Sequence, residues 1–136
     1  DMVFTNNEIT LCDTIEILLR DPKERFISGV NEYCRQNGKG LNHIYRKIQV
    51  GKLVDRHFMP QYLWLLHLYK YHKGPIVLRP FSYIKEITQI HARANERHRH
   101  IEPIERFTKV DNLLLRHLNK TVSLRDIITR YRDVLS

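Results

Sequence analysis

Residues 20–28 of the sequence, Arg-Asp-Pro-Lys-Glu-Arg-Phe-Ile-Ser, combine the side chains and the helix geometry of a phosphate site. Asp21 is a good N-cap and Pro22 suits the first helical position, so a helix is expected to begin here. The first turn of a helix offers N–H groups and a partial positive charge to an anion. Arg20 adds a planar guanidinium, Arg25 a second cation and Ser28 a hydroxyl on the same helix face. The spacing predicts that these three side chains surround one phosphate group.

The elements that position this run are a strand and a helix. Residues 14–19 (TIEILL) are a short apolar run rich in branched side chains, which predicts a buried strand that ends near Arg20. Glu24 occupies the capping-box position of the helix that follows, and the pair Asn37-Gly38 is a stop signal. The apolar residues between them recur at helical spacing: Phe26, Val30, Tyr33 and Cys34. We therefore expect a strand, a tight turn and a helix.

The remainder of the chain predicts an α/β fold in which helix predominates. Helical spacing indicates helices over residues 41–50, 110–118 and 124–135, the last of them capped by Ser123. Residues 76–78 are interpreted as a strand that leads into a helix from about Ser82. Residues 62–71 are almost continuously apolar and fit a buried strand and a helix equally well. Four aromatic side chains in this run are expected to pack in the core rather than to stack on sugars or bases: Tyr62, Trp64, Tyr69 and Tyr71.

The segment 91–105 is polar, highly charged and contains Pro103, which predicts an exposed loop and a candidate lid. His91, His98 and His100 raise the question of a metal site. The arginines interleaved with them repel cations, so no metal site is expected there. The basic residues of this segment are interpreted either as a soluble surface or as a means of attracting an acidic acceptor or the phosphates of a nucleotide.

Bulk properties restrict the classes of protein. A chain of 136 residues has the usual length of one domain. The net charge of +8 favours anionic partners. No apolar stretch approaches the roughly 18 residues of a bilayer span, and the first residues lack the features of a secretory signal, so cytoplasm is the default expectation. Cys12 and Cys34 are too few for a disulfide framework and are expected to be reduced, buried thiols.

Residues 20–28 resemble the 3′-phosphate site of the sulfotransferases that use 3′-phosphoadenosine 5′-phosphosulfate (PAPS). In that family an Arg stands eight positions before a Ser, with a Pro two positions after the Arg, and Arg20, Pro22 and Ser28 occupy those places. Arg25 matches the carbohydrate branch, in which an Arg-Leu or Arg-Phe pair precedes the Ser. The resemblance implies that Arg20, Arg25 and Ser28 bind PAPS or its product, adenosine 3′,5′-bisphosphate. It also implies a P-loop-like sulfotransferase fold with a short parallel sheet.

Residues 54–61, Val-Asp-Arg-His-Phe-Met-Pro-Gln, look like the Asp-x-His-aromatic-x-Pro-Gln element that carbohydrate sulfotransferases place downstream of the phosphate site. By this resemblance His57 is the catalytic base, which takes the proton from an acceptor hydroxyl as that hydroxyl attacks the sulfuryl group. Without the resemblance, His57 beside Phe58 and Pro60 is better interpreted as a packing residue near a turn. The implied activity is sulfuryl transfer from PAPS to a hydroxyl acceptor, which is expected to be a carbohydrate. No interaction with a membrane is expected.

The sequence departs from the family at one place. The Gly-rich loop with a Lys that cradles the 5′-phosphosulfate has no counterpart before Thr14, and the first glycine is Gly29. Residues 1–136 are therefore expected to be a single sulfotransferase-like domain or the C-terminal part of a larger one, and catalysis is expected to depend on that loop. The alternative, which the charge alone supports, is a non-catalytic basic module that contacts nucleic acid through residues 93–106 and the two terminal helices.

Overall fold

The computed structural model describes residues 13–84 and 101–135, and within them it is an α/β fold rich in helix. Its strands are β1 (Ile15–Leu19), β2 (Pro75–Pro80) and β3 (Thr121–Ser123). Its α-helices are α2 (Pro22–Asn37), α3 (Leu41–Gln49), α4 (Tyr62–Tyr69), α6 (Glu105–Leu114) and α7 (Leu124–Tyr131). Short 3₁₀ turns are η1 (Phe81–Tyr83), η3 (Leu115–His117) and η4 (Arg132–Leu135).

The three described strands form one mixed sheet in the order β1-β2-β3. β1 pairs with β2 in parallel, because the chain between them crosses over through α2, α3 and α4. β3 pairs with β2 antiparallel, so the sheet is mixed, whereas a short parallel sheet was expected. Asn119, with φ of 63°, turns the chain next to Leu78 and donates its N–H to the Leu78 carbonyl at 2.6 Å. That turn sets the direction of β3.

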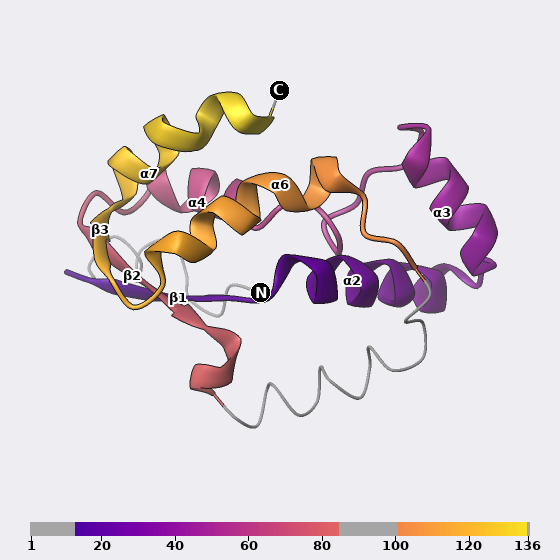
Figure 1. The fold of residues 1–136 in the computed structure, drawn as a ribbon, viewed down its shortest axis with the longest axis horizontal. Coiled ribbons are helices and arrows are strands. Elements are labelled where there is room, and N and C mark those ends of the chain that lie inside the picture. The colour runs from indigo at the N-terminus through magenta and orange to yellow at the C-terminus, as the bar shows by residue number, and fades with distance from the viewer. Residues whose placement is uncertain (1–12, 85–100, 136) are drawn as a thin grey trace.

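The side chains of the described residues pack into two apolar clusters on either side of the β1–α2 junction. Figure 1 shows the sheet at one end of the molecule, α3 at the other and α6 crossing between them. The sheet-side cluster joins the strands to α4, α6 and α7, and the α3-side cluster joins α2, α3 and the start of α6. Phe58 and Phe107 pack edge-to-face in the second cluster, with ring centroids 5.6 Å apart. α6 contributes Phe107 to the α3-side cluster and Val110 and Leu114 to the sheet-side cluster, and so connects the two halves.

Most of the local expectations are confirmed. The first strand, α2 and α3 lie where the sequence places them, and Gly38 ends α2 in the left-handed conformation with φ of 62°. Most of the ambiguous run 62–71 is a helix, α4 (Tyr62–Tyr69). The helix predicted for residues 110–118 begins earlier, at Glu105, while the one predicted for 124–135 gives way to a 3₁₀ turn after Tyr131.

Two expectations for exposure need correction. Ile101, at the end of the predicted exposed segment 91–105, is 5% exposed and packs in the α3-side cluster. Trp64, predicted to be a core residue, is 39% exposed, whereas Tyr62 is fully buried. The predicted helix from Ser82 begins as the turn η1, and the rest of it lies outside the described residues. Cys34 is a free, half-buried thiol, and Cys12 lies outside the described residues.

Candidate functional site

The β1–α2 junction has the geometry that the sequence predicts. The Asp21 carboxylate accepts a hydrogen bond from the Glu24 N–H at 3.0 Å, and Pro22 is the first helical residue. The Asp21 carbonyl accepts the first intrahelical bond, from the Arg25 N–H at 2.9 Å. Arg20 lies immediately before this helix start, and Ser28 is half-buried on α2, one turn beyond Arg25. The helix start between Arg20 and Ser28 is therefore formed.

The Arg20 side chain is buried at this junction, with 6% of the residue exposed. Its guanidinium lies over the ring of Phe81, 5.8 Å from the ring centroid. Burial lowers the pKa of Arg20 to about 10; Glu24 and Asp21 oppose that shift, and Arg25 adds to it. The group still carries its positive charge at neutral pH. Withdrawal from water strengthens its attraction for an anion placed beside it.

Gln61 joins the His57 loop, which we define as residues 54–61, to the end of β1. The Arg20 backbone N–H donates to Gln61 Oε1 at 2.9 Å, and Gln61 Nε2 donates to the Arg20 carbonyl at 3.0 Å. The amide thus pairs with the Arg20 backbone in both directions, as a neighbouring strand would. The two motifs, 41 residues apart in sequence, meet at this paired contact.

Asp111 of α6 holds Gln61 in place for its contact with Arg20. Its carboxylate accepts hydrogen bonds from the backbone N–H groups of Gln61 at 2.6 Å and Tyr62 at 3.0 Å, and so caps the start of α4 from a distant helix. Burial raises the pKa of the Asp111 carboxyl, and the two N–H donors and the charge of Arg25 offset that effect only in part. Sequence reasoning missed Asp111. The available signal was a carboxylate between Val110 and Leu114, on the apolar face of its helix.

Arg25 and Gly29 hold the His57 loop against α2. The Arg25 guanidinium donates to the carbonyl oxygens of His57 at 3.2 Å and Arg56 at 3.3 Å. Burial lowers the pKa of Arg25, and the charge of Asp111 opposes that shift. The α-carbon of Gly29 faces the same His57 carbonyl, so closely that a β-carbon there would lie 1.9 Å from the oxygen. The two observed bonds of Arg25 give it a positioning role; its predicted contact with the nucleotide stays a prediction.

His57 and Asp55 form a hydrogen-bonded pair at the middle of this loop. Asp55 Oδ1 accepts from the His57 backbone N–H at 2.9 Å and also from the ring Nδ1–H. Burial opposes ionisation of Asp55, but the bonds and charge of His57 outweigh it, so the net pKa of Asp55 is lowered. A carboxylate on Nδ1 leaves Nε2 of the neutral ring as the proton acceptor. The pair therefore has the arrangement of a general base with an orienting carboxylate.

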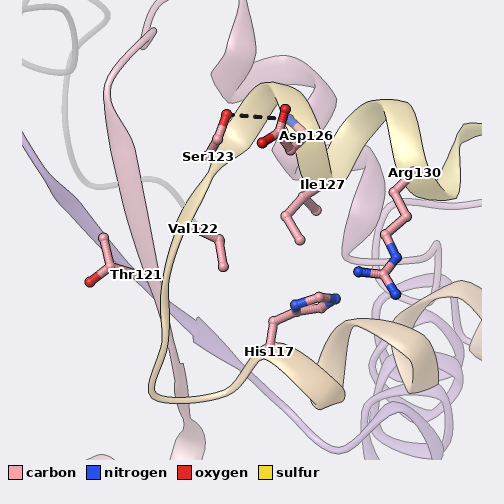
Figure 2. Close-up of a pocket in the computed structure, with 7 residues that line it drawn as sticks. All are labelled: His117, Thr121, Val122, Ser123, Asp126, Ile127 and Arg130. Carbon is pink, nitrogen blue, oxygen red and sulfur yellow. Dashed lines mark hydrogen bonds between the residues drawn. The ribbon is translucent and has the colours of Figure 1, made fainter.

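A separate cleft of about 370 Å³ lies between β3, η3 and α7. Figure 2 shows His117 and Arg130 projecting into it from opposite sides, below the Ser123–Asp126 cap. His117 Nε2 is hydrogen-bonded to the Tyr131 hydroxyl at 2.6 Å. The pKa of His117 is lowered by burial and then by the positive charges of Arg130 and other basic neighbours. No residue predicted to bind the nucleotide lines this cleft.

Metal binding and membrane crossing find no support within the described part of the chain. No group of three or more His, Cys, Asp or Glu side chains there is placed to hold a metal ion. The residues predicted not to bind metal, His91, His98 and His100, lie outside the described residues. No described helix has the length and hydrophobicity that a membrane crossing requires. Comparison of the chain with known protein families, with characterised proteins and with solved structures found no match.

Proposed function

We propose that this chain is a PAPS-dependent sulfotransferase domain that transfers a sulfuryl group to a carbohydrate hydroxyl. Arg20 and Ser28 hold the 3′-phosphate at the start of α2, Arg25 holds the adjoining loop and adds positive charge, and His57 is the general base. The fold proposed with this activity is the P-loop-like sulfotransferase fold, of which β1 and β2 supply parallel strands.

One observation carries the proposal: the two stretches that resemble sulfotransferase motifs contact each other directly. Gln61 pairs with the Arg20 backbone, and Arg25 and Gly29 pack against the His57 carbonyl. Each motif alone is short enough to recur by chance. A chance match has no reason to bring both motifs together, with a buried arginine before α2 and a hydrogen-bonded histidine in the loop packed against that helix.

The proposed reaction balances without a further reactant. An acceptor oxygen attacks the sulfur of PAPS and forms a new O–S bond, while the bond from sulfur to the bridging phosphate oxygen breaks. The electron pair of that bond leaves with the 5′-phosphate of adenosine 3′,5′-bisphosphate. His57 Nε2 takes the acceptor proton, and Asp55 stabilises the imidazolium that results. The products are a sulfate ester, adenosine 3′,5′-bisphosphate and a proton returned to solvent.

Thermal unfolding of the full chain with adenosine 3′,5′-bisphosphate tests the proposal. A ligand that binds only the folded state raises Tm by mass action. The nucleotide should raise Tm in the wild type and in His57→Asn, because His57 does not contact the 3′-phosphate. The rise should be absent in Arg20→Lys, which keeps a positive charge but loses the planar donor fork. A nucleotide that leaves the wild-type Tm unchanged would overturn the proposal.

A second candidate, nucleic-acid binding, draws support from the cleft in Figure 2. The described residues around His117 carry enough positive charge, from Arg130, Lys120 and Arg116, to contribute to the lowering of its pKa. Such a cluster attracts phosphate backbones. A short oligonucleotide in the same thermal assay separates the two functions. Nonspecific nucleic-acid binding fades steeply as salt rises and is unaffected by Arg20→Lys, whereas nucleotide binding depends on Arg20.

A further inference from the structure

A mostly apolar pocket lies directly beside the Asp55–His57 pair. It has a volume of about 300 Å³ and lies between the His57 loop and α4. Asp55 is part of its wall, and the carboxylate of Asp55 is hydrogen-bonded to the His57 ring. The Asp55 carboxylate therefore lies between the His57 ring and the pocket. The pocket thus adjoins the carboxylate that orients the proposed general base.

Two apolar side chains of this pocket, Trp64 and Val54, are not explained by core packing. Trp64 is 39% exposed and Val54 is 56% exposed, although Tyr62 and Leu65 of the same helix are almost completely buried. The indole of Trp64, the only tryptophan of the chain, thus faces the pocket and solvent instead of the core. A large apolar side chain left exposed in a concave site is typical of a ligand-binding surface.

The polar groups at the pocket identify the chemistry of its occupant. Asp55 offers carboxylate oxygens as acceptors, and Arg56 and His67 offer N–H groups. An occupant must therefore present an apolar face to the indole and hydroxyl groups around its edge. A pyranose ring does both, since its axial C–H bonds form an apolar face and its hydroxyls lie at the rim. A pocket of about 300 Å³ is at the small end of ligand sites, a size suited to one sugar ring.

We propose that this pocket binds one sugar ring of the acceptor, stacked on Trp64, with a hydroxyl directed towards the Asp55 carboxylate. This inference rests on the proposed function for its role in sulfuryl transfer, but binding of the sugar itself does not require the nucleotide. The pocket lies between the His57 loop and α4, and neither Arg20 nor Ser28 of the proposed nucleotide site lines it.

Because Trp64 is the only tryptophan, its fluorescence reports on this pocket alone. The full chain is titrated with lactose, with N-acetyllactosamine and with an unsulfated disaccharide of a hexuronate and an N-acetylhexosamine. At least one of these sugars should shift the tryptophan emission saturably, with or without adenosine 3′,5′-bisphosphate. If none of them does so at millimolar concentration, the inference is overturned. A shift with protein concentration alone assigns the pocket to a second copy of the chain and also overturns it.

Variants distinguish stacking of the sugar on Trp64 from general effects on the structure. Sugar binding by each variant is measured by saturation-transfer NMR. Trp64→Ala should weaken sugar binding roughly tenfold, whereas Trp64→Phe keeps an aromatic face and should retain most of it. Tyr83→Ala, which removes a comparably exposed aromatic outside the pocket, should leave binding unchanged. Equal binding by wild type and Trp64→Ala overturns the inference. Sugar binding without any nucleotide-induced rise in Tm refutes the sulfotransferase proposal and leaves the pocket as a glycan site.

Discussion

Replacing Gly29 by alanine places a methyl group inside the backbone of the His57 loop. The added β-carbon would lie 1.9 Å from the His57 carbonyl oxygen, 2.5 Å from its carbon and 3.0 Å from the Phe58 α-carbon. Ordinary van der Waals contact begins near 3.4 Å, so the loop must retreat from α2 by more than an ångström. The atoms in the way are backbone, which cannot rotate aside as a flexible side chain does. The substitution therefore separates the two predicted motifs.

Two effects of opposite sign determine how much Gly29→Ala changes the free energy of unfolding. Ala is favoured over Gly inside a helix by about 0.5–1 kcal/mol, which on its own would stabilise the Gly29→Ala variant. Overpacking costs about 1–3 kcal/mol, and loss of the Arg25 bonds to the His57 and Arg56 carbonyls costs about 1–3 kcal/mol more. We expect the free energy of unfolding to fall by about 1–5 kcal/mol.

Urea denaturation followed by far-UV circular dichroism measures this change, with the slope against urea used to check that compactness is unaltered. Gly40→Ala is the matched control, because a β-carbon at Gly40 meets nothing within 4 Å and its φ is −67°. That variant should stay within about 1 kcal/mol of the wild type. A Gly29→Ala protein as stable as the wild type, or more stable, would mean that helix propensity dominates and that the close contact of α2 with the His57 loop is absent.

Three further predictions concern titratable groups. His57→Asn should lower the rate of sulfuryl transfer about a hundredfold or more, while adenosine 3′,5′-bisphosphate binds as before. Asp55→Asn should lower the rate less. Equal losses of turnover and nucleotide affinity in His57→Asn would contradict the role of His57 as general base. Asp111→Asn should lower the free energy of unfolding, measured by urea denaturation, by about 1–3 kcal/mol. The reason is that the amide NH₂ of the variant would face one of the two backbone N–H groups at the start of α4. An unchanged denaturation midpoint would contradict this. Because the folded pKa of His117 is lowered, its contribution to stability is present above the unfolded value of about 6.5 and is lost as pH falls through the folded pKa. An NMR titration should give a His117 pKa that is below the ordinary value and rises in Arg130→Gln; an ordinary value in the wild type would refute this.

The β1–α2 junction was predictable from the sequence because the residues that determine it are close together in the chain. Asp21, Pro22 and Glu24 act within one helical turn, and Gly38 ends the helix through its own backbone conformation. These signals identify the strand end and the helix start without knowledge of the rest of the chain. The candidate phosphate site was found for that reason.

Other parts of the site depend on contacts between distant residues. The cap that Asp111 provides joins positions 50 residues apart; its place on the apolar face of α6 marks the carboxylate as unusual but does not identify its partner. α4 is apolar on all sides, so its sequence does not show that Trp64 faces outward while Tyr62 is buried. β3 has three residues, too few for an alternating pattern, and its antiparallel pairing follows from the turn at Asn119.

Isothermal titration calorimetry with two nucleotides tests most directly whether the β1–α2 junction holds a 3′-phosphate. The full chain is titrated with adenosine 3′,5′-bisphosphate and with adenosine 5′-monophosphate, which differ only in that phosphate. The account predicts a single site with roughly tenfold or greater preference for the bisphosphate, since charge-assisted hydrogen bonds contribute about 1.5–3 kcal/mol each. Ser28→Ala should reduce that preference without changing the affinity for the monophosphate. Equal affinity for the two nucleotides in the wild type would contradict the account.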